Sequence, residues 1–391
     1  MSTPLPDRHA SIPVPGALER FAHSWKSAAL TLAVGVVLLV ALPFALDDFA
    51  LVQATVYAVM ALLAVSLGFV WGFGGILCFG QSAFFGLGAY TYAIAVTNLG
   101  DSTVPLLLSI VLPAAFAAVL GYLIFYGRLS DVYMGVITLT VTLILFNVVN
   151  STAGPEWTIG KAPLGGFNGI PNIAPLNMPG NVDDVIGPRG MFELSVGALL
   201  AVYLLLRALL AVKLGRVIVA CKENEQRVAL LGYDSRAHKL FAFVLAAAIA
   251  GLAGCLFANW GAFTSPTIFG LAQSAQIIIW VIVGGLGTLV GPIVGCVAIQ
   301  WLTTQIGTQQ AINSNLVLGA ILVVFVLMVP KGIVPSAGQL GVRMLKALRG
   351  GRRDVAAVST QAAVPRTRSA APAADHEASH SAPNASHEET A

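Results

Sequence analysis

Long apolar runs, one after another, constrain this chain more than any other feature of its sequence. Ten of them occur, separated by polar stretches, at residues 28–46, 51–69, 76–97, 104–126, 133–151, 191–212, 238–260, 272–285, 289–306 and 314–330. Most approach the roughly 20 helical residues that cross the hydrocarbon core of a bilayer. The sequence therefore predicts an all-α fold, a polytopic transmembrane helical bundle of about ten spans (eight to ten), including short or broken helices.

The charge content supports this class. Only 10% of the residues are charged and 57% are hydrophobic, whereas a soluble domain carries about 25% charged residues. The first run, 28–46, is longer than a signal-peptide core and no small-residue cleavage site follows it, so we expect a retained span. The four cysteines, Cys78, Cys221, Cys255 and Cys296, are isolated from one another, which indicates buried thiols and neither disulfides nor a metal site.

Lysine and arginine residues indicate the orientation, because cytoplasmic loops retain them. Six of them crowd one internal loop, 213–238, and the residue that follows it: Lys213, Arg216, Lys222, Arg227, Arg236 and Lys239. Ten spans place the N-terminus, this loop and the basic stretch from Lys331 to Arg353 all on the cytoplasmic side. The count depends on a short crossing at 272–285, which glycine and proline separate from the next span. A re-entrant half-helix is the alternative there.

The chain then divides into three parts. Residues 1–27 form a cytoplasmic N-terminal arm, 28–335 the transmembrane domain, and 336–391 a cytoplasmic tail of low complexity, for which we expect disorder. Within the transmembrane domain, 152–190 is the largest external, periplasmic segment. Both the N-terminus and the C-terminus are cytoplasmic in this interpretation.

Glycine is dense in two stretches of the transmembrane domain. Each glycine costs an exposed helix about 1 kcal/mol relative to alanine, so its frequency there indicates close backbone packing or a break in a helix. The predicted hinge or packing glycines are Gly74, Gly75, Gly80, Gly86 and Gly88 in the first stretch, and Gly284, Gly285, Gly287 and Gly291 in the second. Both stretches follow an outside-to-inside span. This favours a pair of hinges at the inner mouth of a pathway, although tight interhelical turns explain the residues equally well.

Four motifs resemble one family of membrane proteins. Residues 75–90 read Gly-Ile-Leu-Cys-Phe-Gly-Gln-Ser-Ala-Phe-Phe-Gly-Leu-Gly-Ala-Tyr. This is similar to the stretch G-L-L-S-L-G-[HQ]-x-A-F-F-G-x-G-A-Y of the LivM family, permeases of bacterial branched-chain amino acid ABC importers. Residues 165–171, 215–233 and 283–292 are similar to further stretches of that family, in the same order. The chain departs from the family pattern at Cys78 and Phe79, where Ser and Leu are usual.

The resemblance implies a function and a set of partners. It implies the permease subunit of an ABC-type importer that carries branched-chain or related hydrophobic amino acids across the bacterial inner (plasma) membrane. The implied partners are a homologous second permease subunit (LivH-like), two cytoplasmic ABC ATPase subunits and a periplasmic substrate-binding protein, beside the small-molecule substrate and membrane lipid. No G-x-x-x-x-G-K-[ST] run, which cradles phosphates, occurs in the chain, so we expect no enzyme activity here and ATP hydrolysis on partner subunits. We expect no cofactor, metal or nucleic-acid partner.

The loop 213–238 is the candidate for contact with the ATPases. We expect ATPase coupling at Arg216, Glu223, Asn224, Glu225, Ala229 and Gly232. Four of these, Glu223, Glu225, Ala229 and Gly232, resemble the acidic-Ala-Gly pattern of permease coupling loops. The amphipathic stretch from Val228 to Leu231 offers apolar contact to a groove on a partner. A plain topology anchor is an alternative explanation for the basic residues.

Polar side chains at membrane depth mark candidates for a translocation path, since such side chains usually face the bundle interior. They are Gln81, Ser82, Tyr90 and Tyr92 on the third predicted span and Asn147 and Asn150 on the fifth. Each of them singly is explained as well by hydrogen bonds to neighbouring helices, worth about 0.6 kcal/mol on average. No predicted span holds Asp, Glu, Lys or Arg at its middle, which favours an importer whose affinity resides in a separate binding protein.

Three alternatives stay open. The urea and short-chain amide branch of the same superfamily bears likeness to Gln81 and to the run from Ile279 to Val281. A stand-alone secondary carrier or channel is disfavoured, because carriers commonly keep an ionisable residue within the membrane. A membrane enzyme is disfavoured because no His, Asp or Glu cluster has acid–base or metal-ligand spacing. The tail histidines His376, His380 and His387 lie in low-complexity sequence.

Overall fold

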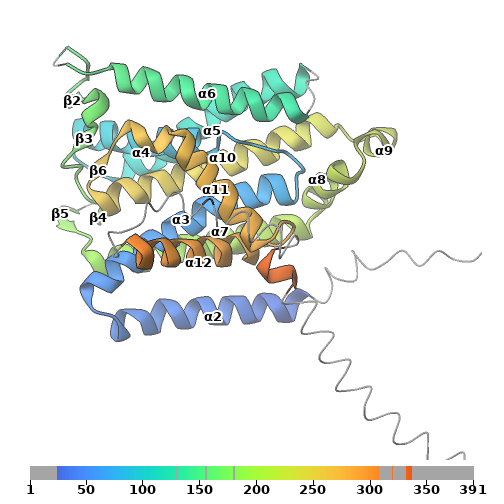
Figure 1. The fold of residues 1–391 in the computed structure, drawn as a ribbon, viewed down its shortest axis with the longest axis horizontal. Helices are drawn as coiled ribbons and strands as arrows, with labels where there is room; N and C mark the ends of the chain where they lie inside the picture. Colours follow the sequence, from blue (N-terminus) through green and yellow to red (C-terminus); the bar gives the residue numbers. More distant parts are fainter. Residues whose placement is uncertain are drawn as a thin grey trace, which may run out of the picture. The chain divides into compact units, whose positions relative to one another are not determined.

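The computed structural model describes residues 24–127, 131–154, 156–178, 181–307, 319 and 332–336 of the 391-residue chain. Helices occupy most of these ranges (Figure 1). The predicted N-terminal arm up to residue 23, the tail from residue 337 and all but Gly319 of the predicted span 314–330 lie outside the described residues.

The long helices follow the order of the apolar runs. They are α2 (Ser24–Ala45), α3 (Asp48–Gly72), α4 (Gln81–Leu99), α5 (Thr103–Tyr126), α6 (Asp131–Ser151), α7 (Pro188–Ala211), α10 (Ser235–Gly261), α11 (Leu271–Gly284) and α12 (Val290–Gly307). Two short helices, α8 (Lys213–Glu223) and α9 (Glu225–Leu230), lie between α7 and α10. Among the described residues, α3, α5, α6, α7 and α10 are long and apolar enough to cross a membrane. The predicted class, a helical membrane bundle, is confirmed.

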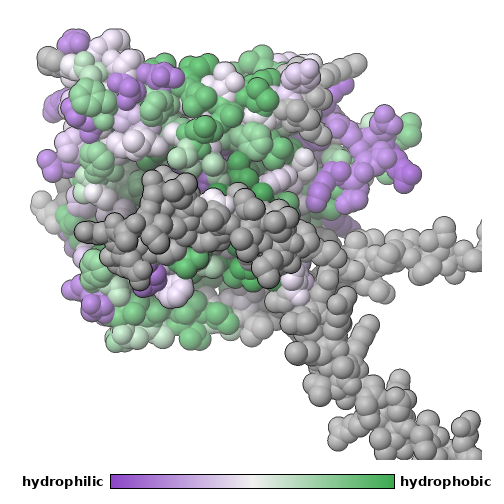
Figure 2. Space-filling model, in the orientation of Figure 1, coloured by the Kyte–Doolittle hydropathy of each residue, from purple (hydrophilic) through white to green (hydrophobic). Residues whose placement is uncertain are grey.

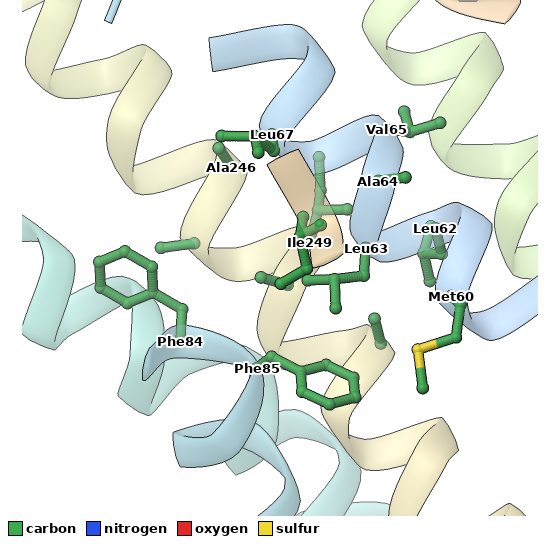
Figure 3. Packing of buried hydrophobic residues seen from close by; sticks show 14 of the residues in the cluster. Met60, Leu62, Leu63, Ala64, Val65, Leu67, Phe84, Phe85, Ala246 and Ile249 are labelled. Atoms are coloured by element: carbon green, nitrogen blue, oxygen red, sulfur yellow. The ribbon is translucent and has the colours of Figure 1, made fainter. Parts of the chain in front are cut away.

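The core lies where α3, α4 and α10 pack together, and Figure 3 shows Leu63 of α3, Phe85 of α4 and Ile249 of α10 in the same buried cluster. Leu62, Leu63 and Leu67 are completely buried. Most buried positions of α10 are alanine or glycine, and small residues allow helix backbones to approach closely. The composition of α10 therefore explains how α4 and α5 both pack tightly against it.

The third span begins later than the sequence predicts. The prediction was 76–97, whereas residues 73–80 form no helix and α4 begins at Gln81. Every residue of this segment is buried or half-buried, which is the condition under which non-helical backbone is tolerated at membrane depth. The backbone N–H of Ile76 donates to the Val70 carbonyl at 3.1 Å. The N–H of Phe79 donates to Thr138 Oγ1 of α6 at 3.2 Å.

The predicted crossing 272–285 is also a short element. The 14 residues of α11 give a length of about 21 Å at the usual helical rise, less than the roughly 30 Å of a hydrocarbon core. A 3-10 helix, η2 (Pro266–Phe269), precedes it. After residue 284 the chain turns into α12, which packs against α11 and α3.

The two ends of the bundle differ in structure. One end carries residues 152–187, here called the cap, and the other carries residues 212–234, here called the loop, with α8 and α9 (Figure 1). Antiparallel strands pair as β1 (Thr158–Ile159) with β2 (Ala162–Pro163), β3 (Ile170–Pro171) with β6 (Phe263–Thr264), and β4 (Asn177–Met178) with β5 (Asn181–Val185), and η1 spans Gly166–Asn168. Figure 2 shows hydrophilic residues gathered at the two ends and hydrophobic surface between them. This distribution fits a membrane-embedded protein.

Candidate functional site

Gln81 and Ser82 open α4 in the interior of the bundle. Gln81 Nε2 donates to Ser66 Oγ of α3 at 2.8 Å and to the Ala246 carbonyl of α10 at 3.2 Å. Ser82 Oγ lies 2.6 Å from Ser274 Oγ of α11. Gln81, Ser82 and Ser274 are all buried. The first turn of α4 is therefore hydrogen-bonded to three neighbouring helices. Because α4 follows the non-helical residues 73–80 and α11 is too short to cross the membrane alone, we call these two the broken helices, and their first turns meet at the serine pair.

Tyr90 and Tyr92 lie farther along α4, toward the cap. The Tyr90 ring packs against Phe269 of η2, with 5.6 Å between ring centroids. Its buried hydroxyl finds no hydrogen-bond partner in the described part of the chain. Tyr92 Oη donates to the Ala174 carbonyl at 3.1 Å. Tyr92 thus ties α4 to the cap, whereas Tyr90 leaves a polar atom in the interior that is open to a partner.

Asn147 and Asn150 lie apart from the other polar candidates. Both are exposed on α6, and Asn147 Nδ2 donates to the Leu143 carbonyl of its own helix at 2.8 Å. The structure does not bring them together with Gln81 or Ser82. A pathway that includes Asn147 would therefore need a second protein chain against α6.

The two glycine stretches lie against each other at the loop end. A Cβ on Gly72 would lie 3.0 Å from the backbone nitrogen of Gly287, and a Cβ on Gly68 would lie 2.3 Å from Cγ of Pro292. The end of α3 therefore packs directly on the turn between α11 and α12. The two predicted hinges adjoin one another.

Residues of this turn and of the segment after α3 need glycine for different reasons. Gly284 and Gly291 face each other, and a Cβ on Gly284 would lie 2.0 Å from the Gly291 carbonyl oxygen. Gly75, Gly285 and Gly287 have φ angles of 71°, 107° and 82°, a region that side-chain-bearing residues rarely adopt. A larger residue is therefore excluded by lack of space at Gly284 and Gly291. At Gly75, Gly285 and Gly287 it is excluded by the positive φ angle.

The remaining candidate glycines allow close packing of α4 and of the segment before it. A Cβ on Gly86 would lie 2.4 Å from the Phe269 ring, and a Cβ on Gly88 would lie 2.2 Å from the Gly251 carbonyl oxygen of α10. A Cβ on Gly80 would meet the Thr138 carbonyl of α6, and one on Gly74 the Val70 carbonyl, both at 2.6 Å. These four glycines lie where a neighbouring ring or backbone leaves no room for a side chain.

Asn224 and Glu225 organise the loop. Asn224 caps α9 by accepting a hydrogen bond from the Arg227 backbone N–H at 2.9 Å, the usual N-cap arrangement. The Glu225 carboxylate accepts from Lys239 Nζ at 2.6 Å and from Ser235 Oγ at 2.8 Å. Partial burial by itself raises the pKa of Glu225, but the hydrogen bonds from Lys239 and Ser235 outweigh it and hold that pKa below its ordinary value. Glu225 thus ties α9 to α10.

The tip of the loop exposes apolar side chains. Leu230 is 87% exposed and Leu231 is 75% exposed, and Figure 2 shows hydrophobic surface among the hydrophilic residues at this end. The other predicted coupling residues, Arg216, Glu223, Ala229 and Gly232, are also exposed. Two leucines that face water at the end of a charged segment indicate a contact surface for a partner.

Charged groups and metal ligands do not gather inside the described part of the bundle. None of the Asp, Glu, Lys or Arg residues whose burial the structure describes is buried. The described residues contain no group of three or more His, Cys, Asp or Glu that could hold a metal ion. The four cysteines are free and buried, as the sequence predicts.

Comparison with known proteins decides the family. Residues 49–326 match the family described as the permease component of the branched-chain amino acid transport system. The chain belongs to this family. The high-affinity branched-chain amino acid transport system permease protein LivM of Escherichia coli (strain K12) is 31% identical to it over 324 residues, which cover 76% of this chain and 73% of LivM. LivM of Salmonella typhimurium (strain LT2) is 30% identical over 320 residues, with the same coverage. No solved structure matches.

All the candidate site residues lie within the part that matches this permease family, but the sequence did not identify their partners. Ser66 and Ser274 bond to candidate residues that lie 15 and 192 positions away in the chain. Lys222 bonds to Gly72, which directly precedes the first glycine stretch, across 150 positions. Ser66 is an isolated polar residue among apolar neighbours, and Ser274 lies between Gln273 and Gln276 at the start of an apolar run. The criterion that selected Gln81, polarity at membrane depth, applies to both serines. Nothing local distinguishes Lys222 from the other basic residues of the loop.

Proposed function

We propose that this chain is the permease subunit of an ABC-type importer of branched-chain amino acids. The observation that carries the proposal is the match of residues 49–326 to the permease component of branched-chain amino acid transport systems. The likeness to LivM over three quarters of the chain supports it. In this proposal the chain works with a homologous, LivH-like second permease, two ABC ATPase subunits and a periplasmic binding protein.

The loop end faces the cytoplasm and the ATPases in this proposal. The lysines and arginines of the loop favour that orientation, because cytoplasmic loops retain basic residues. Leu230 and Leu231 are then the apolar contacts of a short helix that docks into a groove of an ATPase subunit. Asn224 and Glu225 hold the helix in place for that contact through the N-cap and the Lys239 pair.

The translocation path runs beside α4 in this proposal, from the cap past Tyr90 to the serine pair of Ser82 and Ser274. The path offers hydroxyl groups, and no described Asp, Glu, Lys or Arg is buried beside it. An amino acid passing through thus meets only neutral partners and is held weakly. High affinity then comes from the periplasmic binding protein, whose release of substrate into the path sets the direction of transport.

The binding protein contacts the cap in this proposal. Trp157, Ile159 and Phe167 are large apolar residues of the cap with exposed fractions between 48% and 65%. Aromatic residues are enriched in the centres of protein–protein interfaces. These side chains therefore supply a docking surface at the outer end of the path.

Uptake of radiolabelled leucine and urea in cells with and without this gene tests the proposal, with the partner subunits present in both. We expect loss of leucine uptake alone. Loss of urea uptake alone would transfer the chain to the urea and short-chain amide branch. Leucine uptake that depends on this gene but persists without the ATPase genes would indicate a secondary carrier and contradict the proposal.

A further inference from the structure

A lysine of the loop contacts the end of a transmembrane helix. Lys222, in the last turn of α8, donates a hydrogen bond from Nζ to the carbonyl oxygen of Gly72 at 2.8 Å. Gly72 is the last residue of α3, so its carbonyl is among those that have no partner within the helix. A cation at this position also interacts favourably with the helix dipole. Lys222 therefore acts as a cap on α3 that is supplied from the loop.

The stem of Lys222 packs against the non-helical segment that follows α3. A Cβ on Gly75 would lie 2.8 Å from Cγ of Lys222, 3.1 Å from its Cβ and 3.3 Å from its Cα. The backbone of α8 thus lies directly against the backbone at Gly75. A displacement of α8 cannot leave the segment 73–80 unaffected, because only the first atoms of the Lys222 side chain lie between the two backbones.

α8 and the exposed tip of the loop form one packed unit. Val217 and Cys221 of α8 are buried against Val228 of α9, and Tyr233 packs on the same cluster. Val228 directly precedes the exposed tip, residues 229–232. A force applied at the tip is thus transmitted through this cluster to α8, the helix that carries Lys222.

The segment beneath Lys222 leads to the centre of the bundle. Eight residues, 73–80, connect Gly72 to the first turn of α4, where Gln81 and Ser82 are bonded to α3, α10 and α11. Gly72 also adjoins Gly287 of the turn between α11 and α12. The Lys222 contact therefore lies next to the segment that leads into α4 and next to the turn that follows α11. These are the two helices whose first turns meet at the serine pair.

We propose that Lys222 is a positioning residue that transmits movement of the loop to the broken helices α4 and α11, through its contact with Gly72 and Gly75. This inference rests on the proposed function, because the loop moves only if an ATPase docks on it. Other basic residues at this end of the bundle differ in their contacts. Lys213 lies over the ring of Tyr233 within the loop, and Lys239 of α10 pairs with Glu225.

The test compares variants of the complete complex in proteoliposomes that contain the binding protein, leucine and ATP. Lys222→Met keeps the aliphatic stem and removes the donor, whereas Lys222→Arg restores a cationic donor. Arg236→Met is the matched control, since it removes a cation at the same end of the bundle. The Arg236 guanidinium lies over the Tyr126 ring of α5, and no contact of Arg236 with Gly72 or Gly75 is seen. The quantity measured is leucine imported per ATP hydrolysed, with both rates taken from the same vesicles.

We expect Lys222→Met to lower the transport ratio by about fivefold, the factor for one modest hydrogen bond, with ATP hydrolysis maintained. Lys222→Arg should recover most of the ratio, and Arg236→Met should match wild type. An unchanged ratio in Lys222→Met, no recovery in Lys222→Arg, or an equal fall in Arg236→Met would overturn the inference. Failure of Lys222→Met to assemble would also overturn it, because that outcome assigns the lysine to folding. A wild-type complex without ATP-driven leucine uptake would instead refute the proposed function.

Discussion

Replacing Gly88 by alanine tests whether close backbone contact holds α4 in the bundle. The added Cβ would lie 2.2 Å from the carbonyl oxygen and 2.5 Å from the Cα of Gly251 in α10. Ordinary van der Waals contact begins at 3.4 Å. To lengthen the contact from 2.2 Å to 3.4 Å, the two backbones would have to separate by about 1.2 Å.

The cost of this separation follows from the packing around Gly251. A gap of 0.5–1 Å forfeits about a quarter to a half of the dispersion energy between facing atoms, and overpacking a core costs about 1–3 kcal/mol. α10 cannot simply recede, because a Cβ on Gly251 itself would already lie 2.3 Å from the Ser109 carbonyl of α5. We therefore expect Gly88→Ala to lower the free energy of unfolding by about 3 kcal/mol. This corresponds to a decrease of about 100-fold in the ratio of folded to unfolded protein.

Reversible unfolding of the purified protein in SDS measures this loss. Gly197→Ala in α7 is the matched control, since a Cβ there would meet nothing within 4 Å and alanine in a helix is favoured over glycine by about 0.5–1 kcal/mol. The control should be as stable as wild type or more stable. Equal stability of Gly88→Ala and wild type, or equal destabilisation by the two variants, would refute the packing argument.

Three further predictions concern the loop and the serine pair. Leu231→Glu should weaken co-purification of the ATPase subunits and leave SDS unfolding unchanged, and full retention of those subunits would remove the leucine from the contact. In a double-mutant cycle of Ser82→Ala and Ser274→Ala, unfolding should report a coupling of about 0.6 kcal/mol, at most about 1.7, and zero coupling would contradict the hydrogen bond. Because folding lowers the pKa of Glu225, its ion pair stabilises the folded state fully above the ordinary pKa of 4.5 and this contribution is lost as the pH falls through the lowered value. Glu225→Gln should therefore lower thermal stability slightly at pH 7, by less than about 1 kcal/mol, because the Glu225 side chain is 45% exposed. The difference from wild type should disappear in acid. A difference that persists in acid would point to another role for the residue.

The apolar runs were sufficient to predict the helical membrane class and the order of the helices. They misplaced the start of α4, because Ile76, Leu77 and Phe79 are as apolar as the helix that follows. What stops the helix there is the contact of Phe79 with Thr138, 59 positions away, and a positive φ at Gly75. Neither has a signature in local composition, since glycine also occurs in α4 purely for packing.

The candidate site was predictable in part. Polarity at membrane depth identified Gln81 and Ser82, and the structure places both in the interior. The same criterion also selected Asn147 and Asn150, which are exposed on α6. Hydropathy predicts that a residue lies at membrane depth. Whether the residue faces the bundle interior or the surface depends on which helices pack around its own helix. The link from Lys222 to Gly72 is likewise a tertiary contact, made across 150 positions of chain.

The most direct test of the proposed function is leucine uptake by proteoliposomes that contain this chain, its second permease and the ATPase subunits. The binding protein is added outside the vesicles, on the membrane face opposite the ATPase subunits. Uptake should require ATP, the binding protein and this chain together, and a vesicle prepared without this chain should import none. Uptake that proceeds without ATP, or that is unchanged when this chain is omitted, would contradict the assignment of a permease subunit in an ATP-driven importer.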